Sequence, residues 1–173
     1  MLRGAVALLA AAVALVAWLS ERDAEEAAAG PAPLEVRIVE PAALGDAAAL
    51  SGHPVYWAGR VPGTELGLSE GGAGIVQVRY LATGSAADQA QEDVLTVGSY
   101  PLPNPAKALA AFARRSDSTV FRGPHGKLVV TSTESPGSAY FVSPGNSVQV
   151  EVYDPVPRRA LRLVLSGRVR PAP

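Results

Sequence analysis

An uninterrupted apolar run near the amino terminus constrains this chain more than any other feature of its sequence. Gly4 to Leu19 contains 16 residues without a charge, and the charged residues Arg3 and Glu21 lie on either side of it. As an α-helix the run would extend roughly 24 Å, slightly less than the hydrocarbon core of a membrane. Trp18 would then lie at the far interface, which indole rings prefer. The run predicts a membrane anchor or an export signal within residues 1–20.

The sequence allows three interpretations of this apolar segment. A cleaved signal needs small residues at positions −3 and −1 soon after the apolar run. The first good match, Ala27-Ala28-Ala29, begins eight residues after Leu19, which favours an uncleaved single-pass anchor over secretion after cleavage. A buried helix of a soluble protein is the third alternative. Arg3 favours an orientation in the cell membrane with the carboxyl-terminal part outside the cytoplasm.

Residues 21–33 predict a juxtamembrane helix followed by a linker. Glu21 to Ala29 consists of good helix formers, and Gly30-Pro31-Ala32-Pro33 then ends the helix. We expect the extracytoplasmic domain at residues 34–173, a length that can bury a core without cross-links. The chain contains no cysteine, which excludes disulfides and thiolate chemistry.

Within the domain, a helix followed by four strands is expected twice, over residues 41–100 and 104–166. The strands expected in the first unit are Val55–Ala58, Thr64–Leu68, Ile75–Leu81 and Leu95–Tyr100. Those expected in the second unit are Thr119–Arg122, Lys127–Thr133, Ala139–Val142 and Val148–Tyr153. Because the connections are short, most strand pairs should be antiparallel, and the fold class is α+β.

Proline, asparagine and glycine mark the ends of three expected helices. The first is expected at Pro41–Leu50 with Gly52 as its stop, and the second opens with Asn104 as cap and Pro105 in the first turn. A last helix is expected over Pro155–Leu165, with Asp154 as its cap. The stretches LTVGSYPLPNPAKAL and VQVEVYDPVPRRAL each lead from a strand through prolines to a helix. This likeness predicts an internal repeat, with chance similarity of short strand meanders as the alternative.

Alternating residues in two strands identify a candidate binding surface. Val76 and Val78 share one face of their strand while Gln77 and Arg79 share the other. In the second unit, Gln149 and Glu151 likewise alternate with valines. This alternation predicts a sheet covered by helices on one side only. We expect Gln77, Arg79, Gln149 and Glu151 to line an exposed binding platform on the other side.

The motifs that could carry catalysis or a metal have simpler structural explanations. Gly67-Leu68-Ser69-Glu70-Gly71 matches the G-x-S-x-G elbow of serine hydrolases, which requires a strand-to-helix turn over a parallel sheet. Strands are expected on both sides here, so Ser69 is predicted to lie in an exposed hairpin turn. His53 and His125 are expected in exposed loops, and Asp88 to Asp93 lacks the ligand spacing of a calcium loop. We therefore expect no catalytic residue, metal or cofactor.

Charge narrows the range of partners. The net charge of −1 and the pI of about 6.1 disfavour nucleic acid. The carboxyl-terminal end is nevertheless basic, with Arg158, Arg159, Arg162, Arg168 and Arg170. These residues could contact anionic lipid or an acidic envelope polymer, or could simply form a solvated helix face.

Two stretches carry a resemblance to known proteins. GHPVYWAG, from Gly52 to Gly59, and Val150–Ala160 with its Tyr-Asp-Pro resemble membrane-anchored proteins of high-GC bacteria. The resemblance implies the topology above and no particular activity. We expect a non-enzymatic interaction or sensing domain whose partner is the membrane, another envelope protein, a polysaccharide or anionic lipid. The alternatives are an exported hydrolase and a structural envelope protein that binds polysaccharide or lipid.

Overall fold

A computed structural model describes residues 35–84 and 93–173 of the chain. The expected anchor at 1–20, the linker at 21–33 and most of the acidic loop around Asp88 lie outside these ranges. Neither described range contains a helix long and apolar enough to span a membrane.

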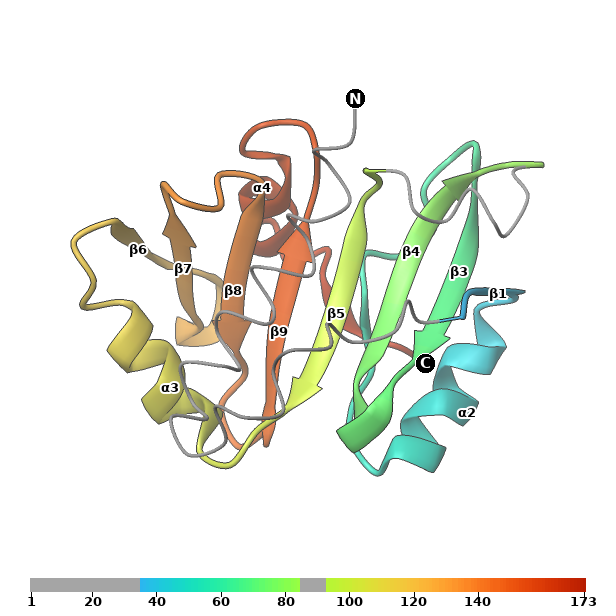
Figure 1. Cartoon of the computed structure of the whole chain (residues 1–173), viewed down its shortest axis with the longest axis horizontal. Helices are drawn as coiled ribbons and strands as arrows, with labels where there is room; N and C mark the ends of the chain where they lie inside the picture. The colour runs from blue at the N-terminus through green and yellow to red at the C-terminus, as the bar shows by residue number, and fades with distance from the viewer. Residues whose placement is uncertain (1–34, 85–92) are drawn as a thin grey trace, which may run out of the picture.

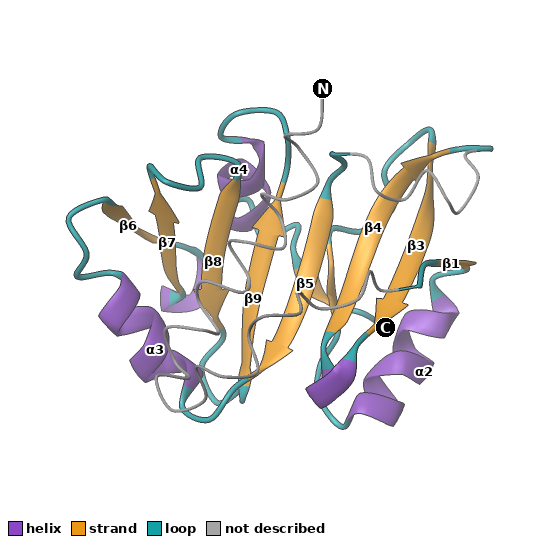
Figure 2. Ribbon diagram, in the orientation of Figure 1, coloured by secondary structure: helices purple, strands orange, loops and turns teal. Residues whose placement is uncertain are grey.

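An eight-stranded antiparallel sheet forms the centre of the domain (Figure 1). Its strands are β1 (Arg37–Val39), β3 (Thr64–Glu70), β4 (Val76–Ala82), β5 (Thr96–Pro101), β6 (Ser118–Arg122), β7 (Leu128–Ser132), β8 (Ser138–Val142) and β9 (Val148–Tyr153). Their spatial order is β1-β3-β4-β5-β9-β8-β7-β6. Together with the helices in Figure 2, this sheet confirms the expected α+β class.

The strand order places the two halves of the domain at opposite ends of one sheet. The first half contributes β1, β3, β4 and β5, and the second half contributes β6 to β9. They meet where β5 pairs with β9, from Thr96 opposite Tyr153 to Pro101 opposite Val148. This seam brings together strands that are about 50 residues apart in the chain.

The strand expected at Val55–Ala58 does not belong to this sheet. Only β2 (Tyr56–Trp57) forms, and it pairs with β10 (Arg170–Pro171) in a separate two-stranded sheet. The Tyr56 N–H donates to Ser99 Oγ at 3.0 Å, and the Ala58 N–H donates to the Tyr80 hydroxyl at 2.6 Å. Because side chains of the large sheet satisfy these backbone groups, the segment can cross the face of that sheet instead of extending its edge.

Two of the three helices begin close to where the sequence predicts. These are α2 (Ala42–Ser51), which ends at Gly52 with φ +71°, and α3 (Pro105–Phe112), which follows Asn104. The third, α4 (Arg159–Leu165), starts four residues later than expected. Pro157 disfavours helical geometry at Val156, and Arg158 then has a left-handed φ of +62°, so the helix begins only at Arg159. Asp154 instead accepts a hydrogen bond from the Val156 N–H at 2.8 Å in a turn.

The sheet has an apolar face and a face with many polar groups. The apolar face carries valines such as Val78 and Val150 and packs against α2, α4 and β2. The opposite face, called the polar face below, carries Gln77 and Glu151. Figure 1 views the polar face, with α4 behind the sheet and α3 at the end formed by β7 and β8.

Helix α3 corrects the expectation that helices cover one side of the sheet only. Its Leu109 and Phe112 pack on the polar face, where the ring of Phe112 meets the ring of Tyr140 edge-on at 5.3 Å. Val130 and Val142 complete this second, smaller core. The end of the polar face formed by β7 and β8 is therefore apolar, and α3 removes that surface from water.

Candidate functional site

The strand registers align polar side chains of both halves in two rows across the polar face. The first row contains Ser69, Gln77, Gly98, Glu151 and Tyr140. The second contains Gly67, Arg79, Thr96, Tyr153 and Ser138. Each row crosses the β5–β9 seam. The structure therefore places Gln77, Arg79, Gln149 and Glu151 on one face, as the alternation predicts.

The prediction that all four side chains are exposed is wrong for two of them. Gln77 and Arg79 are partly exposed, but Gln149 and Glu151 are only 1% and 3% exposed. Alternation identifies the face on which a side chain lies and carries no information about what covers that face. Burial lowers the pKa of the Arg79 guanidinium from its ordinary value, and the neighbouring Tyr100 opposes that shift.

Glu151 lies in a cradle of hydroxyl groups. Ser138 Oγ donates to its Oε1 at 2.8 Å, and the hydroxyls of Tyr100 and Tyr140 also hydrogen-bond with the carboxyl group. Burial raises the pKa of Glu151, and the three hydroxyl partners oppose that shift in part. Burial also raises the pKa of both tyrosines. Gln77 extends the network by donating from Nε2 to the Tyr100 hydroxyl at 3.2 Å.

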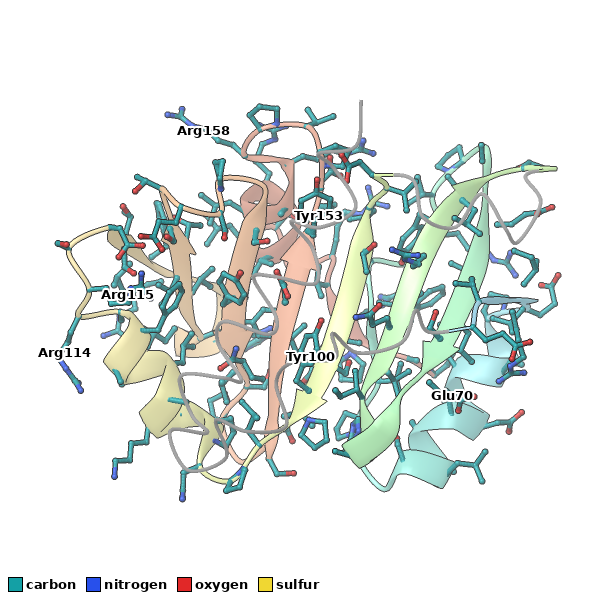
Figure 3. All side chains as sticks on the ribbon, viewed as in Figure 1. Glu70, Tyr100, Arg114, Arg115, Tyr153 and Arg158 are labelled. Atoms are coloured by element: carbon teal, nitrogen blue, oxygen red, sulfur yellow. The ribbon has the colours of Figure 1, made fainter. Side chains whose placement is uncertain are left out.

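Gly98 makes room for this network. A Cβ atom added at Gly98 would lie 2.5 Å from Cε2 of Tyr100, closer than real contacts allow. The Tyr100 ring therefore lies directly over Gly98, and Gly98 is the residue of β5 that pairs with Glu151. Figure 3 shows Tyr100 near the middle of the sheet. A glycine inside a strand often marks such a close approach, and this is the signal that could have indicated the cradle from the sequence.

The hydrolase-like motif does not form a nucleophile elbow. Ser69 lies inside β3, opposite Gln77 of the antiparallel strand β4, and is 1% exposed. The expectation of an exposed turn at Ser69 is wrong, because β3 continues to Glu70. An elbow needs the serine at a strand-to-helix turn, and this serine has strand on both sides.

The two histidines have different environments. His53 is 8% exposed, with Nε2 at 2.6 Å from the Gly74 carbonyl oxygen and Nδ1 at 3.1 Å from that of Pro54. The predicted exposure is thus wrong for His53, which ties the end of α2 to the β3–β4 turn. His125 is exposed, as predicted. Across residues 35–84 and 93–173, no cluster of three or more histidine or acidic side chains could hold a metal ion.

A second candidate surface lies on the layer that covers the apolar face. Arg158, Arg162, Arg168 and Arg170 are exposed, and none of the four forms an ion pair within the described part of the chain. We call these four residues the arginine surface. Arg159 is different, because its Nε lies 3.3 Å from Oδ2 of the buried Asp154.

Local geometry aims the members of the arginine surface outward in two pairs. Arg158 lies directly before α4 with φ +62°, and its carbonyl accepts a hydrogen bond from the Arg162 N–H at 3.1 Å, so these two exposed residues lie within one turn of each other. Arg168 and Arg170 flank Val169, which is 2% exposed, so alternation directs both arginines to solvent. Figure 3 shows Arg158 extending away from the sheet.

Comparison with known proteins finds no match to a family model, to a curated protein or to a solved structure. The likeness to membrane-anchored proteins of high-GC bacteria therefore stays a prediction.

Proposed function

We propose that the chain is a single-pass membrane protein whose domain at 34–173 is a non-enzymatic interaction module outside the cytoplasm. Its arginine surface recognises an anionic component of the envelope. The observation that carries this proposal is the set of four exposed arginines without an acidic partner in the described ranges. Guanidinium groups suit phosphate and carboxylate because they donate in a planar fork.

The proposed membrane anchor would keep the domain close to the membrane surface. Residues 20–33 can extend at most about 50 Å, so the domain remains close to the membrane that holds the apolar run. Near an anionic membrane surface, each arginine contributes about 1 kcal/mol of attraction. Lipid headgroups, acidic polysaccharides and acidic envelope proteins share the anionic chemistry that this surface would recognise.

An interaction module is favoured over an exported hydrolase by the position of Ser69. The one serine in a hydrolase-like motif is buried within β3 and has no elbow geometry. The binding role predicted for Gln77, Arg79, Gln149 and Glu151 remains a second candidate. It rests on Gln77 and Arg79, the two members that are partly exposed.

The tandem helix-plus-four-strand repeat also remains a proposal. In support, β3-β4-β5 and β7-β8-β9 are meanders in mirrored order about the seam. Each leads to a residue with positive φ, Asn104 or Arg158, directly before a helix. The helices differ, since α3 packs on the polar face and α4 on the apolar face. Duplication of a strand meander followed by divergence of the helices accounts for both observations.

Loss of the arginine surface should abolish recognition of anionic surfaces. A domain fragment of residues 34–173 is expected to sediment with vesicles that contain anionic lipid and not with neutral vesicles. Changing all four arginines to Gln should weaken this binding by about two to three orders of magnitude, because about 1 kcal/mol is lost at each position and about 1.4 kcal/mol corresponds to a factor of ten. Salt should weaken binding by the unchanged fragment as well.

The matched control is Arg114→Gln with Arg122→Gln, two exposed arginines on other elements. An acidic polysaccharide in solution provides the second arm and separates polymer binding from lipid binding. Equal binding by the four-arginine variant and the control variant in both arms would refute the proposal.

The topology is tested separately from the ligand. The full-length protein should remain with membranes after a carbonate wash, because its apolar run lacks a nearby cleavage site. An epitope at the carboxyl terminus should be digested by protease added outside the cell. Recovery of the protein in the cytosol, with the epitope protected until lysis, would contradict this arrangement.

A further inference from the structure

Strand β6 is the last strand of the eight-stranded sheet, and no strand of residues 35–84 or 93–173 pairs with its outer edge. Two flanking bonds fix the direction of its backbone groups, since Thr133 N–H donates to the Asp117 carbonyl at 3.0 Å and Gly123 N–H to the Lys127 carbonyl at 2.9 Å. In an antiparallel ladder, alternate residues bond to the same neighbour. The N–H and C=O groups of Thr119 and Phe121 therefore point to β7, and those of Val120 and Arg122 point away from it.

We propose that β6 pairs antiparallel with β6 of a second copy of this chain, with Val120 on the twofold axis. In this register the N–H of each Val120 donates to the carbonyl of the other. The N–H of Arg122 donates to the Ser118 carbonyl of the second copy. The Ser118 N–H already donates to the Arg115 carbonyl oxygen at 3.2 Å, so the pair of Arg122 and Ser118 contributes one bond and not two.

The side chains of β6 are compatible with this register. Val120, one of the few large apolar side chains in the described ranges that are strongly exposed, is 45% exposed and would meet its own copy. Arg122 would lie opposite Ser118, so no pair brings like charges together, which would be destabilising. A pairing about a twofold axis closes on itself, and the dimer would not grow into a fibre.

A second copy is favoured over an extended peptide of another protein by this self-complementarity. The strand contains no proline and has no bulge in its register with β7, and its one charged residue, Arg122, is at its end, so few of the features that block pairing at an edge are present. The opposite edge, β1, has only three residues and offers less pairing.

The absence of cysteine from the chain permits a direct test in membranes. Val120→Cys in the full-length protein introduces a single thiol that should meet its copy across the axis at a Cα separation of about 5.5 Å. Disulfides form at Cα separations of about 4.4–6.8 Å, so mild oxidation should yield a covalent dimer. The control Arg122→Cys lies on the same exposed edge, but its copies would be more than about 13 Å apart and should not cross-link.

A second variant tests the same contact without cross-linking. Val120→Glu would place two carboxylates together at the axis and should convert the detergent-solubilised dimer to monomer in sedimentation, with an unchanged circular dichroism spectrum. Equal cross-linking of Val120→Cys and Arg122→Cys would overturn the proposal. So would a parent protein that is monomeric in detergent and whose Val120→Cys variant does not cross-link in membranes.

Discussion

Glu151→Arg should prevent the domain from folding, whereas Glu151→Gln should stabilise it at neutral pH. Glu151 is 3% exposed and lies among hydroxyl groups, with Ser138 Oγ at 2.8 Å. The described groups that contact Glu151 are hydroxyls and none is a carboxylate, so a buried arginine here would be an unpaired charge, which costs several kcal/mol. That cost is comparable with the whole stability of a domain, about 5–15 kcal/mol. Glutamine keeps the shape and one acceptor oxygen for these hydroxyl groups, its amide N–H groups can donate to a hydroxyl oxygen, and it has no ionisable group.

The stability of the domain should fall as pH rises, because Glu151 is easier to bury in its protonated form. Burial raises the pKa of Glu151 in the folded state above its ordinary value of 4.5. Between these two values the folded state binds more protons than the unfolded state, so the free energy of unfolding falls as pH rises. The contribution of the protonated carboxyl is complete below about pH 4.5 and is lost as pH rises through the folded pKa.

Urea unfolding of the 34–173 fragment between pH 4 and pH 8 would measure this dependence. The parent should lose stability across this range relative to Glu151→Gln. The exposed Glu40→Gln serves as control and should follow the parent curve. Parallel curves for the parent and Glu151→Gln would show that Glu151 keeps an ordinary pKa.

Phe141→Ala should lower the free energy of unfolding by about 3–5 kcal/mol, the usual cost of truncating a buried aromatic side chain. Phe141 is fully buried, and its ring meets Tyr56 edge-on at 5.5 Å. The Lys127 ammonium lies 4.2 Å from the centre of the same ring. Since Tyr56 belongs to β2, the change should also loosen the small sheet from the large one.

Equilibrium unfolding in urea is the measurement for Phe141→Ala. The control is Leu50→Ala on α2, because Leu50 is 84% exposed and its loss should change stability by less than about 0.5 kcal/mol. A loss at Phe141 no larger than that at Leu50 would contradict the position of Phe141 in the core.

Local sequence patterns predicted most elements and failed where distant segments decide the outcome. Gly52 and Pro105 mark helix ends because their backbone preferences act within one turn. Val55–Ala58 has the pattern of a strand, but the sheet that this segment joins depends on β10. Arg170 of β10 pairs with Trp57 although the two residues are more than 100 positions apart in the chain. Likewise, the side of the sheet on which α3 packs depends on apolar side chains of β7 and β8 that follow it in the chain.

On the polar face, too, neighbouring residues in the sequence predict the face on which a side chain lies, whereas distant segments determine what covers it. Alternation placed Gln77 and Glu151 on one face because it depends only on neighbours in the strand. The cradle around Glu151 requires Tyr100 to arrive from β5, and nothing local to Glu151 indicates that β9 pairs with β5. The sequence therefore did not predict the burial of Glu151. The glycine at position 98, inside a strand, was the one indication that another group lies close to the sheet there.

The seam between β5 and β9 also sets the order in which the domain can be completed during synthesis. When the ribosome has made the first half, β5 has β4 on one side, and its other edge has no partner until β9 is made about 50 residues later. An open edge of this length is a site for aggregation. A chain that is stalled or cut between the halves would keep the unpaired edge of β5. Chaperones should therefore stay bound to such a chain longer than to the completed domain, in which β9 covers this edge.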